Sequence, residues 1–161
     1  MDRLLPIAER IAARLIERRE TIGVAEGSAG GLISAALLAV PGASAYFVGG
    51  AVVYTGMARS ALAGIGADDM KGLRPASEPY AALLARRLRE RLNTTWALAE
   101  AGAAGPAGNR YGDPAGHTCV AICGPTQRAI TLRTGSDDRK ANMRAFAAHA
   151  LELLAAEIGA R

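Results

Sequence analysis

A glycine-rich stretch near the N-terminus has the composition of a ligand-binding or catalytic loop. The segment GVAEGSAGGLISAAL (23–37) passes from an apolar run through glycines into an alanine-rich run, which predicts a strand, a tight loop and a helix. In such a unit the free N–H groups and the dipole of the helix favour an anion. Gly27, Gly30 and Gly31 would let a ligand approach the backbone closely, and Ser28 supplies a hydroxyl.

The common signatures of such loops are not met. GxxxxGK[ST], which cradles nucleotide phosphates, is absent, and GSAGG lacks the GxGxxG spacing of dinucleotide-binding loops. The GxSxG pattern of serine hydrolases fails because Glu26 occupies the position of its first glycine. Taken alone, the segment therefore fits a tight turn without a ligand as well as it fits a binding site.

A second glycine-rich region lies later in the chain. GAAGPAG (102–108) follows an apolar run, and YGDPAGHT (111–118) leads into another. If both glycine-rich loops follow strands of one sheet, they face the same crevice, where ligands of α/β proteins usually bind. Glycine and proline would also suit ordinary turns, so both interpretations stay open.

The remaining chain supplies the elements that must position these loops. Helices between strands, followed by a hairpin, predict an α/β sandwich: a single domain over residues 1–161, with a mixed β-sheet and helices on its faces. The predicted helices are 3–18, 30–40, about 57–63, one that Ser77 caps, and one that starts near Ser136 or Asp137; the predicted strands are 21–25, 45–55, 94–102 and a hairpin of 117–124 with 128–134.

Composition argues against several kinds of partner. The net charge is +4, but aromatic residues are only 4% and none interleaves with the arginines of RRLRERL (86–92), so we expect no nucleic-acid groove. Cys119 and Cys123 would lie roughly 13 Å apart in a strand, too far for a disulfide, and no Cys/His cluster suggests a metal. No apolar stretch reaches the roughly 20 residues of a membrane span, so a cytoplasmic protein without membrane contact is expected.

Motifs along nearly the whole chain resemble the C-terminal domain of the competence/damage-inducible CinA proteins. The family pattern is AESCTGG, YSNxxK, AVSE, GIAGPxGG, PVGTV and GDR, in that order. Here the corresponding segments are AEGSAGG (25–31), VVYTGMAR (52–59), PASEP (75–79), GAAGPAG (102–108), PAGHTCV (114–120) and SDDRKANMR (136–144).

This resemblance implies an α/β fold and commonly a homodimer. It also implies a reaction, because stand-alone versions of the domain are nicotinamide mononucleotide deamidases. They hydrolyse the carboxamide of that nucleotide to an acid and ammonia. No metal or organic cofactor is implied.

The two residues that carry the family reaction are both replaced. The resemblance assigns the nucleophilic serine to the position of Gly27 and the lysine base to the position of Arg59. Glycine has no side chain with which to attack, and an arginine stays protonated near neutral pH and cannot serve as a base. The family mechanism therefore cannot operate here in its usual form.

Three functional hypotheses follow. The first is a hydrolase in which Ser28 becomes the nucleophile, with Glu26, Tyr54 or His117 as its base. The second is a protein that binds a nucleotide such as nicotinamide mononucleotide, or another phosphorylated ligand, with weak or lost hydrolysis. The third is a structural or partner-binding homologue without a ligand. For the second we expect the following contacts: Gly27, Gly30, Gly31, Tyr54, Arg59, Ala104, Gly105, Pro106 and Arg139.

Overall fold

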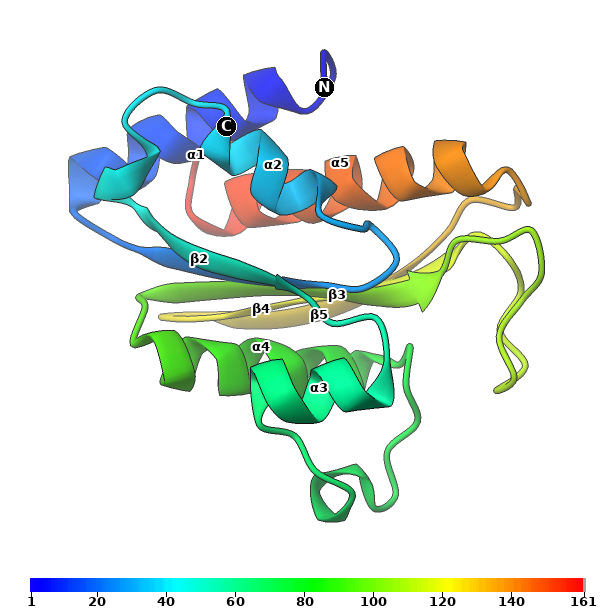
Figure 1. Cartoon of the computed structure of the whole chain (residues 1–161). Helices are drawn as coiled ribbons and strands as arrows, with labels where there is room; N and C mark the ends of the chain where they lie inside the picture. Colours follow the sequence, from blue (N-terminus) through cyan, green and yellow to red (C-terminus); the bar gives the residue numbers. More distant parts are fainter. Residues whose placement is uncertain (161) are drawn as a thin grey trace.

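The computed structural model describes residues 1–160, in which a five-stranded sheet lies between two layers of helices. Helices α1, α2 and α5 cover one face, and α3 and α4 cover the other (Figure 1). The predicted α/β sandwich with a mixed sheet is confirmed. The helices are α1 Leu5–Arg18, α2 Leu32–Leu38, α3 Gly56–Ala63, α4 Glu78–Leu92 and α5 Arg139–Glu157; the strands are β1 Ile22–Glu26, β2 Phe47–Val52, β3 Trp96–Ala103, β4 His117–Cys123 and β5 Gln127–Arg133.

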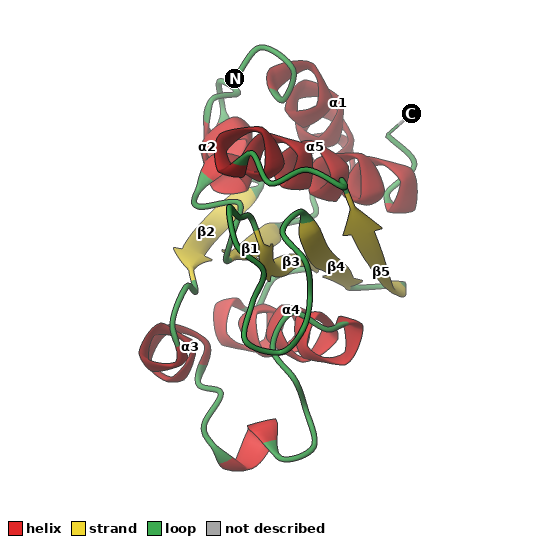
Figure 2. Ribbon diagram, turned by 90° about the vertical axis from the view of Figure 1, so that its right-hand side faces the viewer, coloured by secondary structure: helices red, strands yellow, loops and turns green. Residues whose placement is uncertain are grey.

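The strand order brings three strand ends to one edge of the sheet. The order is β2-β1-β3-β4-β5, with β1 parallel to both β2 and β3, and β4 antiparallel to β3 and β5. The carboxyl ends of β1, β2 and β3 therefore meet at the edge that faces the viewer in Figure 2. The antiparallel β4 begins at this edge, since His117 pairs with Ala103. Both glycine-rich loops consequently leave the sheet on the same side.

Alternation along the strands divides the apolar side chains between two cores. Leu98 packs into the core under α1, α2 and α5, whereas its neighbour Ala99 packs into the core against α4. Because β3 is central, six of its residues in a row, from Trp96 to Ala101, are buried. This central strand fixes the relative positions of the loops at its carboxyl end.

Side-chain caps explain where two elements depart from their predicted bounds. The second strand was expected to reach residue 55, but Thr55 accepts the N–H of Ala58 at 3.1 Å and starts α3 instead. The last helix begins slightly later than expected, because Asp138 accepts the N–H groups of Lys140 and Ala141, each at 3.0 Å. The two cysteines form no disulfide, as predicted, and both are buried. Within residues 1–160, no helix has the length and apolar character that a membrane crossing requires.

Candidate functional site

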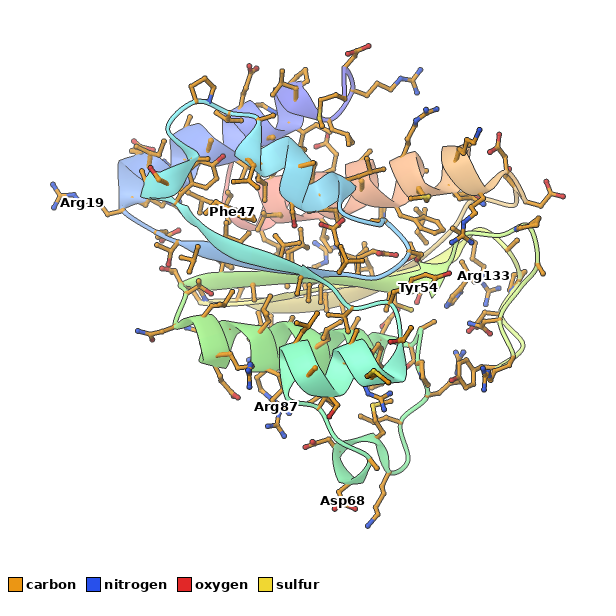
Figure 3. All side chains as sticks on the ribbon, in the orientation of Figure 1. Arg19, Phe47, Tyr54, Asp68, Arg87 and Arg133 are labelled. Atoms are coloured by element: carbon orange, nitrogen blue, oxygen red, sulfur yellow. The ribbon has the colours of Figure 1, made fainter. Side chains whose placement is uncertain are left out.

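A cavity of about 650 Å³ opens at the carboxyl edge of the sheet. One wall comes from Gly27 and Ser28, directly after β1, from residues 53–55 between β2 and α3, and from Gly56, the first residue of α3. Other walls come from Arg59 in α3, from the start of α4 and the segment before it, from the end of β3, and from residues 109–111. Figure 3 shows Tyr54 at this end of the sheet, opposite the end where Phe47 begins β2. The first glycine-rich loop and the second thus contribute to one cavity.

A buried glutamate, Glu100 in β3, holds the first loop in place. Its Oε2 atom accepts the N–H groups of Gly27 at 3.1 Å and Ala29 at 2.8 Å. Its Oε1 atom accepts the hydroxyls of Ser28 and Thr118, both at 2.6 Å. Burial raises the pKa of this carboxyl, and the four hydrogen bonds oppose the rise. The hydroxyl of Ser28 is therefore already directed at a carboxylate of the protein itself.

A second buried glutamate, Glu26 at the end of β1, bonds to the start of α2. Its carboxylate is fully buried and accepts the N–H groups of Ile33 at 3.0 Å and Ser34 at 2.9 Å, as well as the hydroxyl of Ser34 at 2.7 Å. These bonds satisfy free donors in the first turn of α2. The sequence predicted that backbone N–H groups of this loop and helix could bind an anionic ligand. Several of these N–H groups instead donate to the carboxylates of Glu26 and Glu100.

The three glycines of the loop have different roles. Gly30 and Gly31 have φ values of +68° and +99°, which favour glycine, and they turn the chain into α2 outside the cavity lining. Gly27 lies in the lining and has no such conformation. A Cβ atom added there would lie 3.4 Å from the carbonyl oxygen of Glu100 and 3.5 Å from that of Val53, which is van der Waals contact. The backbone at position 27 would therefore admit a side chain.

Two arginines in the lining have no carboxylate partner. The half-buried Arg59 has an Nε atom without a hydrogen-bond partner, and Arg110 is exposed. Among residues 1–160, neither guanidinium forms an ion pair. Burial raises the pKa of Tyr80, the positive charge of Arg59 lowers it, and Tyr111 raises it, so these groups lie close together. The lining thus combines cations with aromatic rings.

Arg139 lies next to the site and connects two of its loops by hydrogen bonds. Its guanidinium donates to the carbonyl oxygen of Gly105 at 2.7 Å and to the hydroxyl of Tyr54 at 3.0 Å, which ties the turn after β2 to the loop after β3. The carbonyl of Ala104 accepts the amide of Asn142 at 2.8 Å. Of these residues, only Tyr54 lines the cavity, and neither Gly105 nor Pro106 does.

His117 supports the cavity wall from behind. Its Nε2 atom lies 2.8 Å from the carbonyl oxygen of Ala76 and 3.6 Å from Asp113 Oδ1. Asp113 also accepts from Arg74 and from Asn109, so the second loop is joined to the segment before α4. The hydrogen bonds of His117 are to this segment, and those of Ser28 are to Glu100. Among residues 1–160, no hydrogen bond joins the candidate base His117 to the candidate nucleophile Ser28.

The site residues that sequence reasoning missed are Glu100, Arg110, Tyr80 and Tyr111. A signal existed for Glu100, because a carboxylate inside the apolar strand WALAEAGA requires partners. Arg110 and Tyr111 belong to the glycine-rich region that was identified as a possible binding loop. Their position in the cavity depends on how that loop folds, which no local pattern gives.

Comparisons with known proteins agree with this fold. The profile of the CinA C-terminal domain matches residues 4–158. A CinA-like protein of Gloeobacter violaceus is 36% identical over 154 residues, which are 94% of this chain and 36% of that protein. A CinA-like protein of Myxococcus xanthus is 40% identical over 138 residues, which are 83% of this chain and 32% of that protein. The chain spans about a third of the length of these curated relatives.

Solved structures match over almost the full length. A competence-damaged protein (CinA) superfamily protein from Klebsiella pneumoniae superposes with a TM-score of 0.90 at 24% identity, covering 97% of this chain and 98% of that one. A competence/damage-inducible protein from Agrobacterium tumefaciens has a TM-score of 0.86 at 28% identity, covering 96% and 94%. The arrangement of helices around the mixed sheet is thus shared with these proteins.

Proposed function

Because the chain belongs to the CinA C-terminal domain family, we propose that it binds a phosphorylated pyridine nucleotide, such as nicotinamide mononucleotide, with weak or no hydrolysis. One observation carries this proposal: Arg59 and Arg110 line the same cavity as several tyrosines, and neither arginine forms an ion pair among residues 1–160. Guanidinium groups bind phosphate through charge-assisted hydrogen bonds, and aromatic rings offer a surface for a heterocycle.

The chemical centre supports binding over turnover. Gly27 stands where the resemblance places the nucleophile, and it has no side chain to form an acyl intermediate. Arg59 stands where the resemblance places the base, and a guanidinium holds its proton at neutral pH. The cavity contains two arginines, while neither member of the catalytic pair that the resemblance implies is present.

A hydrolase that uses Ser28 is the second candidate, and one contact favours it. The Ser28 hydroxyl donates to the carboxyl of Glu100 at 2.6 Å, as a nucleophile would to its general base, and burial raises the pKa of that carboxyl. However, the same carboxylate also accepts two backbone N–H groups and the Thr118 hydroxyl. Four donors stabilise the ionised form and favour a fixed role in holding the loop.

Binding can be measured by titration calorimetry with nicotinamide mononucleotide. We expect saturable binding, weakened about tenfold or more in Arg110→Gln, because a charge-assisted bond to phosphate is lost. The matched control is Arg86→Gln, which removes an exposed arginine of α4 that does not line the cavity. No binding to the wild-type protein at millimolar nucleotide would contradict the proposal.

Ammonia release from the same samples separates the two candidates. The binding proposal predicts no more ammonia from the wild-type protein than from Ser28→Ala. Release well above that variant would favour the hydrolase that uses Ser28 and would overturn the claim of weak or absent turnover.

A further inference from the structure

The cavity lining is rich in hydrogen-bond donors and contains no acid. Its two guanidiniums, from Arg59 and Arg110, can only donate, and no aspartate or glutamate lines the cavity. Glu100 of β3, which holds the first loop, is fully buried, and its carboxylate accepts four hydrogen bonds within the protein. A negatively charged ligand, which accepts hydrogen bonds, therefore complements this lining better than a ligand whose polar group has to donate hydrogen bonds.

Building on the proposed function, we propose that this cavity selects an aromatic carboxylic acid nucleotide over the corresponding carboxamide. The ligand class is a pyridine ribonucleotide whose ring carries a carboxylate. The protein would then hold the acid form of such a nucleotide, which a carboxamide hydrolysis produces, rather than the amide form.

Arg59 is the residue that we assign to the carboxylate. Its Nε atom is buried and has no partner, which is a costly state for a polar group unless a ligand supplies an acceptor. A carboxylate can accept two parallel bonds from the guanidinium fork, whereas a carboxamide offers one oxygen and directs its NH₂ group at other donors. Two effects therefore favour the acid. The guanidinium of Arg59 attracts the carboxylate, and in the complex with the amide one of its N–H donors stays without a partner.

Two side-chain oxygens of the lining, those of Thr55 and Asn109, already accept hydrogen bonds within the protein. The Thr55 oxygen already accepts the N–H of Ala58 at 3.1 Å. The side-chain oxygen of Asn109 accepts the N–H groups of Tyr111 at 3.0 Å and Asp113 at 3.1 Å. These two side-chain oxygens therefore already serve as acceptors within the protein.

The second arginine and the tyrosines explain why the acid should be a nucleotide. Arg110 lies in the loop after β3, on a different segment from Arg59 in α3, so the cavity presents cations from two walls. Tyr80 and Tyr111 line the same cavity and offer aromatic faces to a heterocycle. A ring that carries a carboxylate on one side and a ribose phosphate on the other matches this set of groups.

The test compares two nucleotides that differ only in whether the pyridine ring carries a carboxylate or a carboxamide. Nicotinic acid mononucleotide and nicotinamide mononucleotide are titrated separately into the wild-type protein by calorimetry. The acid is expected to bind about tenfold tighter or more, since the carboxylate forms an ion pair with the guanidinium and accepts two parallel bonds from it, whereas the carboxamide is neutral and offers one oxygen.

Two variants test whether Arg59 causes the preference for the acid nucleotide. Arg59→Gln should bind the two nucleotides within about threefold of each other, while Arg86→Gln should keep the full preference of the wild-type protein. Melting temperatures of both variants establish that they fold. Because Arg59 lines the cavity and forms no ion pair among residues 1–160, its replacement is not expected to unfold the domain.

The outcomes separate this inference from the proposed function. Equal affinities in the wild-type protein, or tighter binding of the amide, would overturn the preference while leaving nucleotide binding intact. Retention of the preference in a folded Arg59→Gln protein would overturn the assignment to Arg59. Failure of both nucleotides to bind would contradict the proposed function itself.

Discussion

Replacement of Glu100 tests whether its carboxylate holds the first glycine-rich loop. In Glu100→Ala the N–H of Ala29 and the hydroxyls of Ser28 and Thr118 lose their acceptor. The N–H of Gly27 keeps a bond to the backbone oxygen of residue 100 at 2.9 Å. Three buried polar groups are thus left without a partner.

The size of the effect follows from these three groups. Each unsatisfied buried group costs about 1–3 kcal/mol, and relief from desolvation of the carboxylate offsets part of the sum. We expect Glu100→Ala to lower the free energy of unfolding by about 3 kcal/mol. Glu100→Gln should cost less, about 1 kcal/mol, because its amide oxygen can accept the N–H groups while its NH₂ donates to the hydroxyl oxygens.

Urea denaturation followed by circular dichroism measures both values. The matched control is Glu90→Ala, which removes an exposed glutamate of α4 and should change stability by less than about 0.5 kcal/mol. A Glu100→Ala protein as stable as the wild type would refute the assignment of Glu100 as the residue that holds the loop.

The pH dependence gives an independent check on the same carboxyl. Burial raises its pKa above the usual 4.5, so the folded protein binds this proton more tightly than the unfolded chain. The stability from the protonated form is complete below pH 4.5 and is lost as the pH rises through the folded-state pKa. The cost of Glu100→Gln should therefore be largest near pH 4.5 and shrink toward neutrality; a cost that grows with pH would contradict the direction of the shift.

Three further predictions concern the site and its supports. The double variant Gly27→Ser with Arg59→Lys should gain measurable ammonia release from nicotinamide mononucleotide, because position 27 admits a side chain; complete inactivity of the folded variant would contradict an otherwise intact cavity. Asp138→Ala removes the cap of α5 and should cost about 1 kcal/mol in urea denaturation. Burial pushes the pKa of Asp113 up, but the hydrogen bond from Asn109 and nearby cations outweigh it, and the pKa is lowered from 3.8. Wild-type stability from this group is present above pH 3.8 and lost on acidification, so Asp113→Asn should flatten the acid side of the stability profile.

The fold was predictable because its signals are local. Alternation and helical periodicity predicted the strands and helices, and a cap such as Ser77 marked the start of α4, where it accepts the N–H of Tyr80 at 3.4 Å. The parallel pairing of β1 with β2 and β3 then follows from the helices that connect them. Several predicted bounds differ from the observed ones by a few residues, and at the end of β2 the reason is the cap Thr55, which begins α3.

The site was predictable in its location but not in its contacts. The glycines after β1 and β3 indicated one edge of the sheet, and Tyr54 and Arg59 do line a cavity there. The bond between Ser28 and Glu100 joins residues 72 positions apart, and strand pairing alone brings them together. The same holds for the hydrogen bond from Arg139 to the second loop, which depends on where α5 begins.

One measurement addresses the central claim most directly, namely that this cavity binds a pyridine nucleotide without turning it over. Nicotinamide mononucleotide is mixed with the protein, and saturation-transfer NMR is recorded on the pyridine protons over a day. If the cavity binds the nucleotide without hydrolysing it, saturation is transferred to these protons and no resonances of the acid product appear. Absence of transfer, or steady growth of the acid resonances, would contradict this claim.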